Sequence, residues 1–405
     1  MKKYKNMQKM IIAVIMLVII LCTNSVASIM FGATQIEIGL CLIGLFFIFV
    51  NKNTDYNIGV FYSYVIFLCL LTLLQYIIYP ENIFHWLRLV LLFIVMTHIS
   101  IYTITRSINV AEIYYRLILF MCIISTAVYF PVEIGNMDIP HSTLSVDWLP
   151  TYDVYYYVYC SMQIDLGTET FMGFSFKRNC GYFTEPGLYA FFIVSALFIF
   201  LFLKKKKTKW ELVVWLTTLL TTFSTTGLIL TVIIVAYYFN SRNIKTIFVR
   251  IGFASLSIVA VVYIITDLLA AKQVEHANSF TSRMIDLIGG IKLFCEQPLL
   301  GYGYKNFDVF NSYSLQFFPV ERNNSNGVVS ALYQLGLIGC SIFYIPFIYV
   351  RKKIKHHKSL FTLYTLVLIV LMMGEPIQYT TTGACIIGYI MAAIMTRKKV
   401  ELTFI

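Results

Sequence analysis

The sequence predicts an all-α integral membrane protein, a single polytopic domain over residues 1–405 with about twelve transmembrane helices and two large extracytoplasmic loops. Three observations predict this class: the composition, the length of the apolar runs and the placement of the charges. Hydrophobic residues make up 59% of the 405 and charged residues only 13%. So few charges cannot cover the surface of a soluble protein of this length, and soluble folds are excluded.

The apolar runs are about 14–24 residues long, enough to cross the roughly 30 Å hydrocarbon core as helices that satisfy their own backbone hydrogen bonds. One region is ambiguous: Trp210 to Phe239 is short for two crossings and is broken by Ser224-Thr225-Thr226-Gly227. We expect a hairpin there, with a polar tip at or below the outer surface that faces protein or water. The expected runs are 10–30, 37–50, 57–79, 84–105, 113–132, 187–203, 210–223, 226–239, 247–268, 327–350, 359–373 and 382–396.

The charges predict the orientation. With the N-terminus inside, 23 of the 31 lysines and arginines fall on the inner segments, together with only four of the 20 acidic residues. This bias is the positive-inside pattern of a bacterial-type cytoplasmic (inner) membrane, with both termini on the cytoplasmic side. The net charge of +11 is therefore interpreted as a topology signal, and no nucleic-acid partner is expected. Val26-Ala27-Ser28 weakly resembles a signal-peptidase site, but the long apolar run before it favours a retained helix.

Two outer loops, at about residues 133–185 and 267–326, each exceed fifty residues, and long loops in an otherwise economical fold usually carry function. The first holds an aromatic patch from Trp148 to Tyr159, suited to the membrane interface or to stacking on sugar rings. The second begins with a helix-like stretch, Ser282–Phe294, that is expected along the membrane surface. Outer cysteines at 160, 180 and 295 make a disulfide chemically possible. No Cys/His cluster suggests a metal, and no cofactor is expected.

The end of the first loop, Lys177 to Gly187, is the most unusual local string. Pro186 suits the first turn of a helix, which places Glu185 at or next to the N-cap. A capping carboxylate and a functional one are both open interpretations. Arg178 is harder to explain structurally, because only two other arginines, Arg283 and Arg322, occur on the outer side.

The second loop adds Ser282-Arg283, then Gln297 to Gly303, then Arg322-Asn323-Asn324-Ser325-Asn326, and Leu335-Gly336-Leu337-Ile338-Gly339 follows it. Gly301 and Gly303 permit a tight turn and close approach to a ligand, or simply end a helix. Asn324 and Asn326 are ordinary caps taken singly, but with Arg322 they form a polar rim. Gly336 and Gly339 are predicted to be helix-packing positions.

Arg88 is a separate candidate, about one turn inside the outer end of its helix. Its side chain either snorkels to the interface or binds a lipid diphosphate.

Arg-x-x-Gly-x-Phe-x-Glu-Pro-Gly at 178–187 resembles the signature of O-antigen and capsule repeat-unit polymerases. The Ser-Arg…Pro-Leu-Leu-Gly-x-Gly…Asn…Gly-Leu-Ile-Gly series at 282–339 is similar to the second-loop pattern of the wider O-antigen ligase/polymerase superfamily, and Ser-Thr-Thr-Gly at 224–227 resembles its helix break. Lipopolysaccharide ligases typically carry a histidine near the end of this loop, where 322–326 reads Arg-Asn-Asn-Ser-Asn; the only histidine of the loop is His276. The departure favours a polymerase over a ligase.

The resemblance implies a polyprenyl-diphosphate-dependent glycosyltransferase that joins undecaprenyl-diphosphate-linked oligosaccharide repeat units into O-antigen, capsule or exopolysaccharide. The activated diphosphate leaving group makes a metal optional, and the expected protein partners are a chain-length regulator and a flippase. An O-antigen ligase and, from another class, a lipid-linked oligosaccharide flippase remain the alternatives; a flippase usually keeps its loops short and its charges in a central cavity. The expected catalytic residues are Glu185, Arg178 and Arg283, and the expected substrate-binding residues are Arg88, Gly181, Gly187, Gly301, Gly303, Arg322, Asn324 and Asn326.

Overall fold

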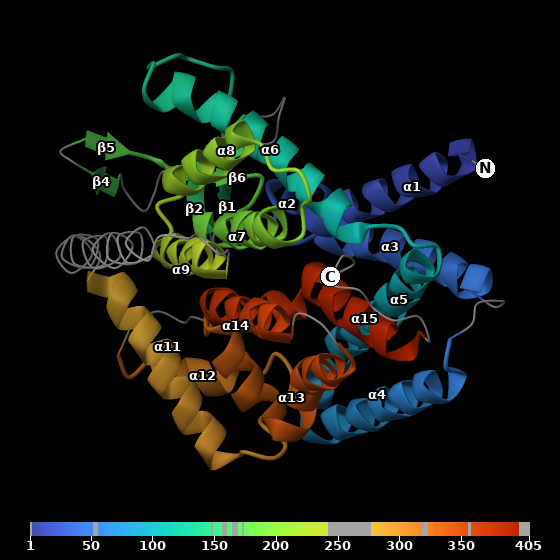
Figure 1. The fold of residues 1–405 in the computed structure, drawn as a ribbon. Coiled ribbons are helices and arrows are strands. Elements are labelled where there is room, and N and C mark those ends of the chain that lie inside the picture. The colour runs from blue at the N-terminus through green and yellow to red at the C-terminus, as the bar shows by residue number, and fades with distance from the viewer. Residues whose placement is uncertain are drawn as a thin grey trace. The chain divides into compact units, whose positions relative to one another are not determined.

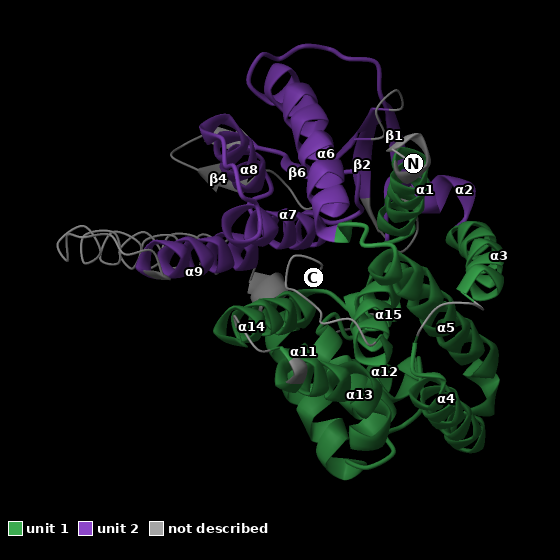
Figure 2. Ribbon diagram, turned by 45° about the vertical axis from the view of Figure 1, so that its right-hand side comes forward, with its two compact units in different colours: residues 1–23, 33–110, 278–405 green, residues 24–32, 111–277 purple. Residues whose placement is uncertain are grey.

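A computed structural model describes residues 2–51, 56–146, 149–155, 160–163, 169–171, 174–241, 277–317, 323–354 and 358–396. The expected crossing at 247–268 and the candidate Arg322 lie outside these residues. The chain divides into two compact units, coloured separately in Figure 2. Unit 1 comprises residues 1–23, 33–110 and 278–405, and unit 2 comprises residues 24–32 and 111–277.

Unit 1 is a helical assembly whose core lies between α5 and α15 (Figure 1). Helix α5 buries fourteen residues, and Gly388 of α15 allows the two backbones to approach, because a Cβ there would lie 2.7 Å from the Met96 carbonyl carbon. The elements of the unit are α1 (Lys2–Leu21), α3 (Ala33–Val50), α4 (Ile58–Ile78), the 3₁₀ turn η2 (Pro80–Asn82), α5 (Ile83–Thr105), α11 (Ala277–Glu296, whose first residue lies in unit 2), α12 (Phe307–Ser314), α13 (Gly327–Lys353), α14 (Lys358–Gly374), the 3₁₀ turn η3 (Ile377–Tyr379) and α15 (Thr381–Met395).

Among the described residues, five helical segments are long and apolar enough to cross a bilayer: Ala33–Val50, Ile58–Ile78, Pro80–Thr105, Val110–Glu133 and Gly327–Lys352. Five further apolar helices are 10–17 residues long. The α4 helix leaves large apolar side chains such as Ile66 and Ile77 more than half exposed, as a lipid-facing helix does. The predicted membrane-protein class is therefore confirmed, while the number of about twelve crossings stays a prediction.

The expected first run, residues 10–30, is not one helix. The α1 helix ends at Leu21, and α2 (Val26–Phe31) belongs to unit 2. The α2 helix begins with a capping box in which the Ser25 and Ser28 side chains each bond to the backbone N–H of the other. The two serines start a new helix inside an otherwise apolar run, after a turn in which Asn24 has a φ of 43°.

Unit 2 combines helices with a sheet that the sequence did not predict. The first outer loop folds into four antiparallel strands in the order β1-β2-β3-β6, and β4 and β5 form a separate hairpin. The elements are α6 (Val110–Glu133, whose first residue lies in unit 1), β1 (Ser142–Val146), β2 (Leu149–Tyr155), β3 (Cys160–Gln163), β4 (Glu169–Phe171), β5 (Phe174–Phe176), β6 (Arg178–Gly181), α7 (Pro186–Phe202), α8 (Lys209–Thr221) and α9 (Thr225–Ser241).

Both faces of the four-stranded sheet are buried. Tyr152 and Val154 of β2 pack with Val26 and Cys180, and Tyr155 packs on the other face with Tyr129 of α6. Part of the aromatic patch is thus a strand with side chains on alternating faces.

Among the described residues, Cys160, Cys180 and Cys295 are free thiols, so the possible outer disulfide is not formed. Cys160 is opposite Tyr155 in the β2–β3 pairing, whereas Cys180 packs in the cluster on the other face. Burial raises the pKa of the Cys160 thiol to about 12.

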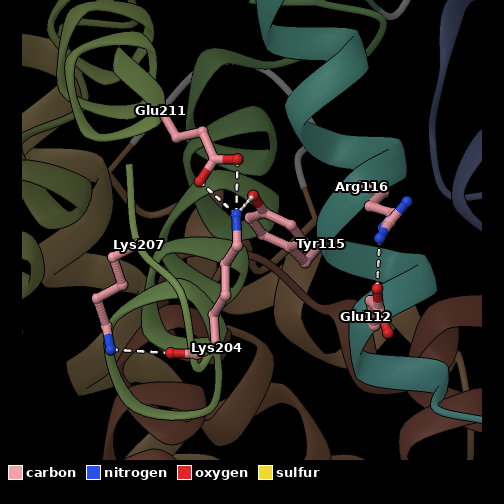
Figure 3. A network of polar contacts seen from close by, with 6 residues as sticks. All are labelled: Glu112, Tyr115, Arg116, Lys204, Lys207 and Glu211. Carbon is pink, nitrogen blue, oxygen red and sulfur yellow. Dashed lines mark hydrogen bonds and ion pairs between the residues drawn. The ribbon is translucent and has the colours of Figure 1, made fainter. Parts of the chain in front are cut away.

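A polar network fixes the turn between α7 and α8, which is predicted to lie on the inner side (Figure 3). The Lys204 ammonium donates to the Glu211 carboxylate at 2.6 Å and to the Tyr115 hydroxyl at 2.6 Å. Glu211 is only 6% exposed, so its charge depends on this partner. Lys204 therefore has a structural role in addition to its predicted role in orientation.

Candidate functional site

The predicted site residues divide between the two units. Unit 2 holds Arg178, Gly181, Glu185 and Gly187 of the first-loop motif, whereas unit 1 holds Arg88, Arg283, Gly301, Gly303, Asn324 and Asn326. Each group is described within its own unit.

Arg178 lies on the edge strand β6, against the end of α8. Its Nε donates to the Thr222 carbonyl oxygen at 3.3 Å, and the neighbouring Asn179 amide donates to the Thr221 hydroxyl at 3.0 Å. The last carbonyls of a helix lack partners within the helix and carry partial negative charge, which favours a guanidinium.

The break between α8 and α9 is the predicted polar tip. The α8 helix ends at Thr221 and α9 begins at Thr225, with Phe223 at a φ of 49° between them. The Ser224 hydroxyl accepts the Gly227 N–H at 3.3 Å. Because β6 packs on α8, the tip faces protein, one of the two environments that the sequence allowed.

The turn from β6 into α7 needs a glycine at 181. Gly181 has a φ of 59°, and a Cβ there would lie 2.4 Å from the Tyr189 ring. Phe183 follows, fully buried and stacked on Phe192 with ring centroids 4.4 Å apart. Backbone conformation and packing therefore account for Gly181 without a ligand.

Glu185 occupies the N-cap of α7, and Pro186 is the first helical residue, as predicted. Its backbone is extended (φ −136°, ψ 139°), and its side chain makes no capping hydrogen bond. Within the part of the chain that the structure describes, the half-buried carboxylate also has no ion pair. The capping interpretation is therefore not supported, and the carboxylate remains available as a proton acceptor at the positive end of a helix. Gly187 lies in the first turn after it.

In unit 1, Arg283 belongs to a relay of hydrogen bonds that joins α11 to the segment before α13. Its guanidinium donates to the Ser325 hydroxyl at 2.6 Å and to the Gly374 carbonyl oxygen at 3.0 Å. The Ser325 hydroxyl donates in turn to the Asp286 carboxylate, which also accepts the Ser325 N–H at 3.1 Å. Arg283 is exposed, whereas Asp286 is fully buried.

Asp286 is a residue that the sequence reasoning missed. It follows Arg283 by three positions in a helix, which places both side chains on one face. That spacing could have identified it, whereas its contact with Ser325 depends on the tertiary fold.

Asn324 and Asn326 hold the main chain of the same segment. The Asn324 amide donates to the Asp286 carbonyl oxygen at 2.7 Å, and its oxygen accepts the Asn326 N–H at 2.8 Å. Asn326 is the N-cap of α13 and accepts the Val329 N–H at 3.1 Å. Both residues are buried, so a structural role accounts for them; their predicted contact with substrate stays a prediction.

Gly301 and Gly303 lie against the main chain of α13, at a point where that helix is interrupted. Helix α13 is interrupted at Gly336, which has a φ of 60° and a ψ of −173°. The prediction that Gly336 is a helix-packing position was therefore wrong, because its conformation breaks the helix.

The segment 298–303 fills this interruption with four backbone hydrogen bonds. The N–H groups of 302 and 303 donate to the carbonyls of 333 and 334, and those of 337 and 338 donate to the carbonyls of 298 and 299. A Cβ on Gly301 would lie 2.5 Å from the Gln334 carbonyl oxygen. The glycine-containing segment 298–303 and the interruption of α13 at Gly336 are thus held together by main-chain hydrogen bonds.

Arg88 forms an ion pair that the sequence did not predict. Its Nε lies 2.9 Å from a carboxylate oxygen of Glu37, which is 5% exposed. Pairing across two helices is a third explanation beside snorkelling and diphosphate binding.

An apolar pocket lies between α13, α14 and α15 of unit 1. Phe343, Phe347, Leu368 and Ile387 line it, together with Gln378. The pocket suits a hydrocarbon chain.

Comparisons of the chain with protein-family models, with curated proteins and with solved structures found no match.

Proposed function

We propose that this chain is a polysaccharide polymerase, a glycosyltransferase that joins undecaprenyl-diphosphate-linked oligosaccharide repeat units at the outer face of the bacterial cytoplasmic membrane. The observation that carries the proposal is the Glu185 carboxylate, which begins a helix without capping it, seven residues after the anchored Arg178. An acid without an ion pair among the described residues, together with a guanidinium group, suits glycosyl transfer from a diphosphate.

In the proposed reaction, an acceptor sugar hydroxyl attacks the anomeric carbon of the donor glycan. A new carbon–oxygen bond forms, and the bond from that carbon to the lipid diphosphate breaks. The hydroxyl proton passes to Glu185, and the diphosphate leaves with the bonding electron pair. Arg178 stabilises the growing negative charge, because a guanidinium group stays charged and binds phosphate oxygens in pairs. Arg283, in the other unit, is a second candidate for this role on the sequence motif alone.

Preorganisation distinguishes the two arginines from flexible surface cations. Arg178 is held by the end of α8, and Arg283 by Ser325 and a main-chain carbonyl. Donors fixed before the reaction stabilise developing charge better than groups that must reorganise. The pocket between α13, α14 and α15 would hold part of a lipid tail.

The charge distribution supports the orientation in the inner membrane, with both termini cytoplasmic. Protein partners consistent with this function are a chain-length regulator and a flippase. The sequence and the described fold leave the ligase and the flippase as competing functions.

Complementation of a gene deletion tests the proposal. Wild type, Glu185→Gln, Arg178→Ala and Arg283→Ala are compared for surface glycan on a gel, with Arg116→Ala as the control. Arg116 is an exposed arginine that pairs with Glu112 at 2.5 Å, and it is predicted on the inner side.

If the chain is a polymerase, the deletion strain should carry a single repeat unit on the cell-surface anchor. The three site variants should show the same product at normal protein level. Long chains that accumulate on undecaprenyl diphosphate would indicate a ligase. Single repeats stranded on the inner leaflet would indicate a flippase, and the proposed chemistry would then be wrong.

A further inference from the structure

A group of charged residues in unit 1, Arg88, Glu37 and Lys305, lies at the ends of α3 and α5 that are predicted to face outward. Glu37 is the fifth residue of α3 and Arg88 the sixth of α5. At 1.5 Å per residue, both lie about 6–8 Å inside their helix starts. This is the depth at which a long cationic side chain reaches lipid headgroups.

Lys305 of the second outer loop lies near this ion pair. It is the residue after Tyr304, whose ring lies 5.4 Å from that of Trp86 on α5. Burial lowers the pKa of Lys305, the nearby Arg88 guanidinium lowers it further, and Glu37 acts in the opposite direction. The contact of Tyr304 with Trp86 and the bond from Asn82 to Lys305 bring Lys305 to the same end of α5 as Arg88, where each charge acts on the other.

The main chain of Lys305 is held in an unfavourable conformation. Its φ is 57°, a left-handed value that is uncommon for a residue with a side chain. The Asn82 amide donates to its carbonyl oxygen at 3.0 Å, and its own N–H donates to the Gln334 side chain at 3.0 Å. Such strain persists where the surroundings impose it, often at ligand sites.

Both cationic side chains keep nitrogen atoms that could bind an anion. Glu37 faces the Nε of Arg88, which leaves the two terminal nitrogens of the guanidinium, and the Arg88 side chain is 34% exposed. Lys305 forms no ion pair within the described ranges of the chain, and its ammonium lies 6.0 Å from the Tyr304 ring centroid. Two cations beside one buried carboxylate leave a net positive charge in a poorly solvated place, which an anion would stabilise.

We infer that Arg88 and Lys305 form a binding site for the phosphate group of a lipid in the outer leaflet, with Glu37 orienting the guanidinium. Phosphate accepts paired hydrogen bonds from a guanidinium and a further one from an ammonium. A lipid source is favoured over a free ion, because Arg88 lies on a helix, α5, that exposes the apolar side chains of Phe84 and Leu87. The inference does not depend on glycosyl transfer.

The test measures lipid binding by the full-length chain in detergent micelles, by native mass spectrometry. The probes are dioleoyl phosphatidic acid and dioleoylglycerol, which differ in the phosphate alone. We expect the wild type to bind phosphatidic acid in preference to dioleoylglycerol. Arg88→Gln and Lys305→Gln should each weaken phosphatidic acid binding by about tenfold or more, the loss of one charge-assisted hydrogen bond. Lys305→Arg should retain it.

Glu37→Gln separates a binding site from a purely structural ion pair. Removal of the competing carboxylate should tighten phosphatidic acid binding, because the net positive charge rises by one. The matched control is the exposed pair of Arg116 and Glu112 in α6, where Arg116→Gln and Glu112→Gln should leave binding unchanged.

Three results would overturn the inference. The first is equal binding of the two lipids. The second is unchanged phosphatidic acid binding in folded Arg88→Gln and Lys305→Gln proteins. The third is full competition by inorganic phosphate at the concentration of the lipid, which would assign the site to a free ion. Loss of polymer in cells with lipid binding intact would leave this site standing, so failure of either proposal is distinguishable.

Discussion

Asp286 offers the sharpest test of how the second loop holds Arg283. The buried carboxylate accepts both the hydroxyl and the N–H of Ser325, and the same hydroxyl accepts a bond from Arg283. Asp286→Asn keeps the size of the side chain but removes its charge. Hydrogen bonds to a charged group are worth about 1.5–3 kcal/mol and neutral ones about 0.5–1.5. With two bonds weakened by about 1 kcal/mol each, the free energy of unfolding should fall by about 2 kcal/mol.

Ser325→Ala should lower the stability by a similar amount, since it removes the hydroxyl that joins the two charges. If the three residues act as one relay, the double variant should lose less than the sum of the singles, with a coupling of about 1 kcal/mol. The assay is reversible unfolding of the purified protein by SDS titration in mild detergent. Asp308→Asn is the control, because Asp308 is an exposed acid of the same loop.

The functional readout separates positioning from general loss of fold. In a polymer assay with matched amounts of folded protein, Asp286→Asn should reduce repeat addition about tenfold, and Arg283→Ala added to it should have little further effect. Strictly additive stability losses, or an Asp286→Asn protein as stable as wild type, would refute the relay.

Three further outcomes follow from the structure. Lys204→Met should lower the free energy of unfolding by about 3 kcal/mol because it strands the buried Glu211 charge, and Glu211→Gln in the same chain should restore most of it, as chemical denaturation will show. The exposed Cys295 should react with a membrane-impermeant maleimide added outside intact cells, while Cys160, with a pKa of about 12, should stay unlabelled until the protein is unfolded; protection of Cys295 would contradict the orientation. Gly336→Ala should lower the free energy of unfolding by about 3 kcal/mol, seen as a lower melting temperature of the purified protein, since its φ is 60° and the new Cβ would lie 2.3 Å from a backbone oxygen.

Local features of the sequence predicted much of the helical structure. Pro186 predicted the start of α7 and the N-cap position of Glu185, and three-to-four spacing predicted the α11 helix. The small polar residues at 224–227 predicted the break between α8 and α9. Each of these depends on a few neighbouring residues, so one segment suffices to predict it.

The features that were missed depend on residues far apart in the chain. The hydrogen bond of Asp286 with Ser325 and the ion pair of Arg88 with Glu37 form only when distant segments of the chain pack together. The sheet of the first loop was missed for a different reason. Its strands are short, and an aromatic run such as that around Tyr155 suits a membrane interface as well as a strand that is buried on both faces.

The residues discussed in the two outer loops divide into two physical groups. Gly181, Gly301 and Asn326 satisfy backbone conformation, close packing and helix caps. Glu185 and Lys305, by contrast, have charged groups without an ion pair in the described ranges, although an unpaired charge stabilises no fold. Substitution in the first group should therefore lower protein levels together with any activity. Substitution in the second should leave a folded protein that has lost its ligand or its reaction, and this contrast identifies which residues the chemistry uses.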